Sequence, residues 1–144
     1  MKNRGCLIAF IVALAIAGFF AYGIKRALTP RDLSKEDPRR AFESFVCSPL
    51  PQSVREINAR GVVAFAGGNA SIEFHIDPRD IDDLIRRGKF ELADTRAAHW
   101  ITEFKPEGVA GNIVRYVRIN EGASQTALFV TEDKGRAWFH EIQF

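Results

Sequence analysis

An apolar run opens the chain. Residues 5–24 carry no charge and lie between Arg4 and Lys25. A helix of this length rises about 30 Å, which matches the hydrocarbon thickness of a bilayer. We therefore predict a single-pass transmembrane helix at residues 5–24, preceded by a short basic head at residues 1–4.

A cleaved secretory signal is the alternative interpretation of this segment, with Lys2 and Arg4 as its basic region. The apolar run is longer than the roughly 7–15 residues of a usual signal core, which favours a retained anchor in the cell membrane. Basic residues are more numerous after the run than before it, which favours a cytoplasmic domain. A short basic head before a first helix is instead usual where the following domain crosses the membrane, and we expect the domain on the extracytoplasmic side.

The segment after the apolar run mixes charges with Pro30 and shows no apolar periodicity. It is predicted to be a charged linker, at residues 25–37. The rest of the chain, residues 38–144, is predicted to form one globular domain.

Capping residues mark two helices in this domain. Asp37-Pro38 predicts the start of the first, which should end before Pro49. Asp77-Pro78 predicts the start of the second, and Gly88 its end.

Between these helices, an extended segment at residues 53–66 should turn at Gly67–Asn69 and return as a strand at residues 71–76. Apolar and polar residues alternate in the returning strand, which predicts one buried and one polar face. The polar face carries Ser71, Glu73 and His75. Residues 89–111 fit no single element.

Strand-forming residues fill the last third of the chain, and the predicted strands are residues 112–119, 126–131 and 136–144. Asp133–Gly135 predicts a three-residue hairpin loop with its glycine in the left-handed conformation. This loop would place Val130 opposite Trp138 and Phe129 opposite Phe139. The element order is helix, two strands, helix, three strands. We therefore predict an α+β domain, with an antiparallel sheet of about five strands and two helices packed on it.

The composition agrees with one domain on a membrane anchor. The chain has 144 residues, of which 47% are hydrophobic and 26% charged. Its formal charge of +2 is too small for a typical nucleic-acid-binding protein, so we expect no nucleic-acid partner. The two cysteines, Cys6 and Cys47, cannot form a disulfide framework.

Candidate catalytic or metal-binding residues are few. The three histidines, His75, His99 and His140, have acidic neighbours in the sequence, but their spacing matches no usual set of metal ligands. We expect no metal and no cofactor, and we interpret the histidines as surface or half-buried residues. Cys47 is expected to be a buried thiol, because no basic residue or helix N-terminus lies beside it in the sequence.

Aromatic residues are more numerous than one sheet face requires. A candidate partner surface consists of Trp100, Tyr116, Phe129 and Phe139. The alternative is that another layer of the fold covers these side chains, because monomers seldom expose large apolar patches.

Several local features resemble those of small bacterial envelope proteins of unknown function. They are Pro51-Gln52-Ser53-Val54 before a strand, the Asp77-Pro78 helix ending in Leu84-Ile85, a tryptophan near residue 100 and a closing hairpin. The resemblance implies a membrane-anchored or lipid-anchored setting and no catalytic residues. Cys6 differs from a lipid-modified cysteine because it precedes the apolar run.

We therefore expect a membrane-tethered, noncatalytic envelope domain that binds a protein or glycan partner, with residues 5–24 in the lipid bilayer. The alternative function is a small membrane-bound hydrolase that uses His75, His99 or His140 with neighbouring acids.

Overall fold

The computed structural model describes residues 3–64, 67–93, 99–103, 106, 109, 111–118 and 124–143. Of residues 3–11, 26–28, 99 and 100 only the helical backbone is described. The elements in chain order are α1 (Asn3–Leu28), β1 (Arg31–Asp32), η1 (Leu33–Lys35), α2 (Pro38–Phe45), β2 (Arg55–Ala64), β3 (Gly67–His75), α3 (Ile81–Arg87), β4 (Glu91–Leu92), α4 (His99–Glu103), β5 (Ile113–Arg118), β6 (Ser124–Thr131) and β7 (Arg136–Gln143).

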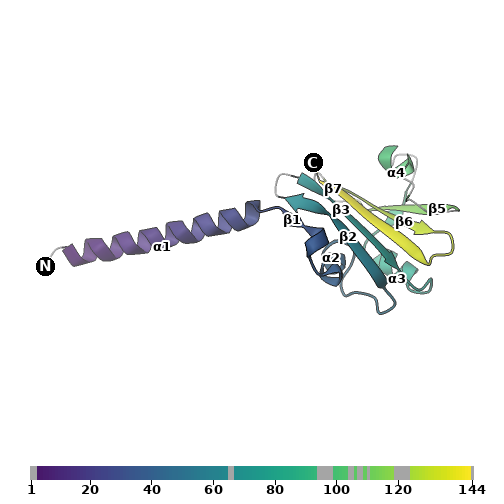
Figure 1. Ribbon diagram of the computed structural model, residues 1–144, viewed down its shortest axis with the longest axis horizontal. Coiled ribbons are helices and arrows are strands. Elements are labelled where there is room, and N and C mark those ends of the chain that lie inside the picture. The colour runs from purple at the N-terminus through teal and green to yellow at the C-terminus, as the bar shows by residue number, and fades with distance from the viewer. Residues whose placement is uncertain are drawn as a thin grey trace.

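The fold is α+β, as predicted, and its centre is a seven-stranded antiparallel sheet (Figure 1). The strand order is β1-β2-β3-β7-β6-β5-β4. The prediction of about five strands is wrong because two-residue strands lie at both edges. β1 comes from the predicted linker, and β4 comes from the segment that fitted no single element.

Helix α1 extends away from the sheet (Figure 1). Within α1 the structure describes the side chains of residues 12–25, and all of these are exposed. Among them, Leu14, Phe19 and Ile24 are 57%, 79% and 57% exposed. Within the described residues, no helix is both long and apolar enough to cross a membrane.

The predicted linker is not an unstructured tether throughout. Its second half adds β1 to the edge of the sheet, where Arg31 lies opposite Val63. Leu33 in η1 is only 1% exposed and belongs to the core. The Arg31 guanidinium donates to both carboxylate oxygens of Glu36, at 2.9 and 2.7 Å. Sequence periodicity missed this segment because it contributes a single buried side chain.

Helix α2 begins where its capping residues predict. The Asp37 carboxylate accepts a hydrogen bond from the Arg39 backbone N–H at 3.1 Å, and Pro38 is the first helical residue. Phe42 has no exposed surface, and its ring meets that of Phe74 edge to face at 4.9 Å. The helix therefore packs directly on the sheet.

The predicted turn at Gly67–Asn69 is wrong, because these residues lie within β3. Ala64 pairs with Gly67, so the connection falls on residues 65 and 66, outside the described residues. Gly61 has a φ of +117°, and a Cβ at this position would lie 2.3 Å from the Asn69 carbonyl oxygen. Glycine is required there by the close approach of the two backbones.

Helix α3 begins later than predicted. Asp77 does not cap the helix but starts a turn, in which its carboxylate accepts from the Arg79 backbone N–H at 2.9 Å. The helix itself runs from Ile81, with Asp80 before it, and Gly88 follows its last residue as predicted.

The register of the closing hairpin is also one residue away from the prediction. Phe129 pairs with Trp138, and Leu128 pairs with Phe139. The loop has four residues instead of three because the Thr131 hydroxyl accepts from the Arg136 backbone N–H at 3.1 Å and closes the hairpin there. A single-residue change of register exchanges the faces on which the opposing side chains lie.

The sheet consequently has an apolar core on each face. The larger core joins α2 and α3 to one face through residues that include Phe42, Ile72, Leu84 and Phe139. On the other face, Ile101 of α4 packs with Phe129 and Trp138. Over β2 and β3 this second face carries mainly polar side chains, among them Asn58, Arg60, Ser71, Glu73 and His75.

Candidate functional site

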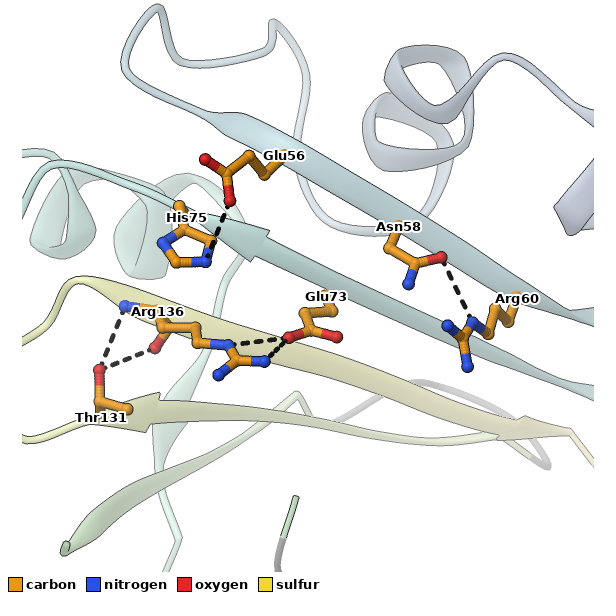
Figure 2. Close-up of polar contacts among 7 residues, drawn as sticks. All are labelled: Glu56, Asn58, Arg60, Glu73, His75, Thr131 and Arg136. Atoms are coloured by element: carbon orange, nitrogen blue, oxygen red, sulfur yellow. Dashed lines mark hydrogen bonds and ion pairs between the residues drawn. The ribbon is translucent and has the colours of Figure 1, made fainter. Parts of the chain in front are cut away.

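A polar cleft of about 670 Å³ lies where β3 ends and β2 and β7 begin. It is lined by Gln52, Ser53, Arg55, His75, Ile76, Asp77, Pro78, Val109, Thr131, Asp133, Gly135 and Arg136. Its size is within the range of small-ligand sites, but those sites are usually mostly apolar. Figure 2 shows the strands that carry its central side chains.

An irregularity in β2 brings an acidic residue to the rim of this cleft. Arg55 pairs with His75 and Asn58 with Glu73, so Glu56 and Ile57 together face a single residue of β3. This is a β-bulge, and Glu56 adopts a φ of 54°, which is uncommon for a residue other than glycine. The bulge keeps Ile57 on the core side while Glu56 reaches His75 (Figure 2).

Glu56 and His75 form an acid–histidine pair. The Glu56 Oε2 atom lies 3.5 Å from His75 Nε2, and the pair is ionic when the imidazole is protonated. The His75 side chain is 35% exposed and that of Glu56 is 71% exposed. Water therefore reaches both groups, and the pair is weakly held compared with a buried one.

Arg136 is held more firmly. Its Nε donates to Glu73 Oε1 at 2.8 Å, and its Nη2 bonds the same oxygen. Its guanidinium also lies over the Trp138 ring, 4.8 Å from the centroid. These contacts fix Arg136 in the cleft wall and neutralise much of its charge.

The two aspartates at the rim stabilise turns. Asp133 accepts from the Thr131 hydroxyl at 2.5 Å and from the Gly135 backbone N–H at 3.0 Å. These bonds lower the pKa of Asp133, the Thr131 hydroxyl having the larger effect. Asp77 is bound to the Arg79 backbone N–H. Asp133 is thus held by two bonds within its turn and Asp77 by one.

Arg55 differs from these residues. It is exposed and lines the cleft, and none of the described carboxylates forms an ion pair with it. Further along β2 on the same face, Arg60 is also exposed and donates to the Asn58 side-chain oxygen at 3.3 Å. The cleft therefore offers one uncompensated cation together with several hydrogen-bonding groups.

The other histidines do not join His75. His140 Nε2 lies 3.2 Å from the Ser71 hydroxyl, and burial lowers the pKa of His140. Ser71 and His75 are four residues apart on β3, which is about 13 Å in a strand. The side chain of His99 lies outside the described residues. Among the residues that the structure describes, no three metal-ligating side chains gather at one place.

Two of the four residues of the predicted aromatic surface are not exposed. Phe129 and Phe139 have no exposed surface and belong to the cores on opposite faces of the sheet. Tyr116 is half-buried against the larger core, and the side chain of Trp100 lies outside the described residues. Other layers of the fold cover both phenylalanines, which agrees with the alternative interpretation of these aromatic residues. Cys47 is buried as expected, and burial raises the pKa of its thiol.

Sequence reasoning identified the polar face of β3 but missed Arg55, Glu56, Thr131 and Arg136. Glu56 enters the site through a bulge, and Arg136 through pairing with His75, a residue 61 positions earlier in the chain. Alternation along residues 136–140 would have placed Arg136 and His140 on one face of their strand. The pairing register alone shows that this face lies beside Ser71 and His75 of β3.

Comparison of the chain with protein-family models, curated proteins and solved structures finds no match.

Proposed function

We propose that this protein is a membrane-tethered, noncatalytic domain of a bacterial envelope that binds a protein or glycan partner in the polar cleft. The observation that carries the proposal is the contrast between the two parts of the molecule. None of the side chains described in α1 belongs to the domain core, while the folded domain has a polar cleft at the end of its sheet.

The anchor is residues 5–24. This run is uncharged over its whole length, which extends beyond the side chains that the structure describes. Exposed apolar side chains such as Phe19 and Phe20 occur around the described part of α1. An apolar surface on all sides of a helix is unfavourable in water and favourable in lipid.

The cleft favours a polar ligand. Arg55 supplies a cation without a carboxylate partner among the described residues, and Gln52, Ser53 and Thr131 supply groups that donate or accept hydrogen bonds. Glycan hydroxyls and the polar groups of a peptide meet these requirements, whereas a lipid tail does not. We place the domain on the extracytoplasmic side, as expected from the basic residues Lys2 and Arg4 before the apolar run.

The position of the cleft suits a tethered receptor. β1, which follows α1 after two residues, pairs with β2 near Val63, and Gly68 of β3 lies opposite that residue. From Gly67 to His75, β3 covers about 26 Å at roughly 3.3 Å per residue. The His75 end of β3 is therefore the end far from the anchor (Figure 1), and His75 lines the cleft.

Photo-crosslinking in intact cells tests the proposal. A photoreactive residue in place of Gln52 on the cleft rim should capture a discrete protein or glycan adduct. The same residue in place of Arg79, which is exposed outside the cleft lining, is the matched control. Equal adducts at both positions, or none at Gln52, would refute the assignment of the cleft as a binding site.

The anchor and the side of the membrane are tested separately. Full-length protein should stay with the membrane fraction in alkaline carbonate, and its intact mass should include residues 1–24. External protease should digest the domain in cells whose outer barrier is permeabilised. Release by carbonate would refute the anchor, and protection from protease would place the domain in the cytoplasm.

A hydrolase is the second candidate, and two specific contacts favour it. Glu56 at the rim of the cleft lies beside His75, and Ser71 lies within hydrogen-bonding distance of His140. A neutral imidazole beside a serine hydroxyl is the arrangement of a general base and its nucleophile. The variants His75→Ala and His140→Ala test this in cells from which the wild-type gene has been deleted. If they fail to restore wild-type behaviour while crosslinking at Gln52 is retained, the enzyme is favoured over the binding domain.

A further inference from the structure

The charges of the chain are distributed unevenly. Residues 25–40 contain six basic and three acidic residues, a net charge of +3, whereas residues 41–144 contain twelve basic and fifteen acidic residues, a net charge of −3. The positive segment begins directly after the apolar run and includes β1, η1 and the first turn of α2. Opposite net charges therefore mark the anchor end and the remainder of the domain.

The structure keeps part of this positive charge free. Arg31 is bound to Glu36, and Lys35 lies 3.1 Å from Asp32. Arg39 and Arg40 are exposed, and neither forms an ion pair with a carboxylate among the described residues.

Two arginines in the first turn of α2 are also contrary to helix electrostatics. The N-terminus of a helix carries partial positive charge and favours acidic residues. The first turn of α2 contains no acidic residue, only Arg39 and Arg40 after Pro38. The Asp37 carboxylate at the N-cap and the electrostatic attraction of Glu36 for Arg40 offset part of this positive charge. An anion outside the fold is the favourable partner for the rest.

We propose that a basic surface, defined by Lys25, Arg31, Lys35, Arg39 and Arg40, docks on the anionic lipid headgroups around the anchor. This inference rests on the proposed anchor at residues 5–24. Under this proposal, the end of the domain that contains β1 and α2 is held against the bilayer. The cleft at the His75 end of β3 then faces away from the membrane.

The distances allow this contact. From Ile24 the chain continues as helix to Leu28 and reaches Arg31 three residues later. At about 1.5 Å per helical residue and at most about 3.5 Å per extended one, Arg31 lies within roughly 16 Å of the hydrocarbon edge. Headgroups occupy about 5–8 Å of that distance, and the Debye length is about 8 Å at physiological salt. α2 lies beside β1 at this end of the domain (Figure 1).

Hydrogen exchange of the full-length protein in nanodiscs tests the docking. One set of discs contains phosphatidylcholine alone, and the other contains phosphatidylglycerol as well. Peptides covering residues 37–45 should exchange more slowly on the anionic discs, by about fivefold for each arginine engaged, and high salt should remove the difference. Peptides from β6, in the interior of the sheet, should exchange equally in both.

Matched variants assign the effect to the surface. Arg39→Gln with Arg40→Gln should abolish the difference between the two discs. Arg79→Gln with Lys89→Gln removes the same charge from exposed positions beside α3 and should preserve it.

The outcomes separate this inference from the proposed anchor. Stable incorporation into discs with equal exchange on both lipids overturns the docking and leaves the anchor intact. Failure to incorporate into either disc overturns the anchor and the docking together. Persistence of the lipid dependence in the Arg39/Arg40 variant would also refute the docking surface as defined.

Discussion

Arg118 is expected to be the most important single charge for the stability of this domain. Its guanidinium donates to the Gly88 carbonyl at 2.7 Å, the Phe45 carbonyl at 3.0 Å and the Val46 carbonyl at 2.6 Å. These carbonyls lie at the C-terminal ends of α2 and α3 and have no donor from the next turn of their helices. Arg118 from β5 thus caps two helices and joins them to the sheet.

The site is partly removed from water. The guanidinium lies 4.4 Å from the centroid of the Phe90 ring and 5.8 Å from that of Phe139. Burial lowers the pKa of Arg118, but guanidinium keeps its proton at any physiological pH.

We predict that Arg118→Met lowers the free energy of unfolding by about 3 kcal/mol. Three hydrogen bonds from a charged donor contribute about 1.5–3 kcal/mol each, and the several kcal/mol that burial of the cation costs offset part of this. Methionine retains apolar contact with Phe90 and Phe139, so the loss reports on the donors. Arg118→Lys keeps a cation at both helix ends but not the planar arrangement of donors, and should lose about 1–2 kcal/mol.

Urea unfolding of the full chain in detergent micelles measures these changes. Tryptophan fluorescence reports on the folded state because Trp138, one of the two tryptophans of the chain, is only 5% exposed. A loss below about 1 kcal/mol in Arg118→Met would refute the reasoning, since the carbonyls would then be satisfied without the guanidinium. Equal losses in the methionine and lysine variants would show that the donor geometry is irrelevant.

Three further predictions concern other sites. Gly61→Ala should lower the free energy of unfolding by about 2 kcal/mol, because its φ of +117° and the nearby Asn69 carbonyl exclude a side chain; an unchanged Tm in calorimetry would contradict this. Cys47 should react with iodoacetamide at least about tenfold more slowly in native than in urea-unfolded protein, because burial raises its pKa. Equal rates by peptide mass spectrometry would show an accessible thiol. Burial lowers the pKa of His140 below its ordinary value of 6.5, so the unfolded chain binds the proton first as the pH falls. Stability should decline below about pH 6.5, and His140→Gln should flatten that decline in urea midpoints; an identical slope would contradict the prediction.

The sequence by itself determined the features that depend on neighbouring residues. Asp37-Pro38 marks the start of α2 correctly because a cap acts within one turn, and Gly88 marks the end of α3 for the same reason. Alternation in residues 71–76 correctly separates the core face of β3 from its polar face. The α+β class follows from this order of local patterns.

The tertiary structure alone decided how these elements meet. The hairpin register depends on one additional loop residue, which the Thr131 hydroxyl and the Arg136 backbone select. Leu33 joins the core, and β1 the sheet, only because β2 supplies a partner far along the chain. The cleft depends on a bulge at Glu56 and on the pairing of β3 with β7, which places His75 opposite Arg136. Strand pairing is a contact between distant residues, and no local pattern of polar and apolar positions specifies its partner or its register.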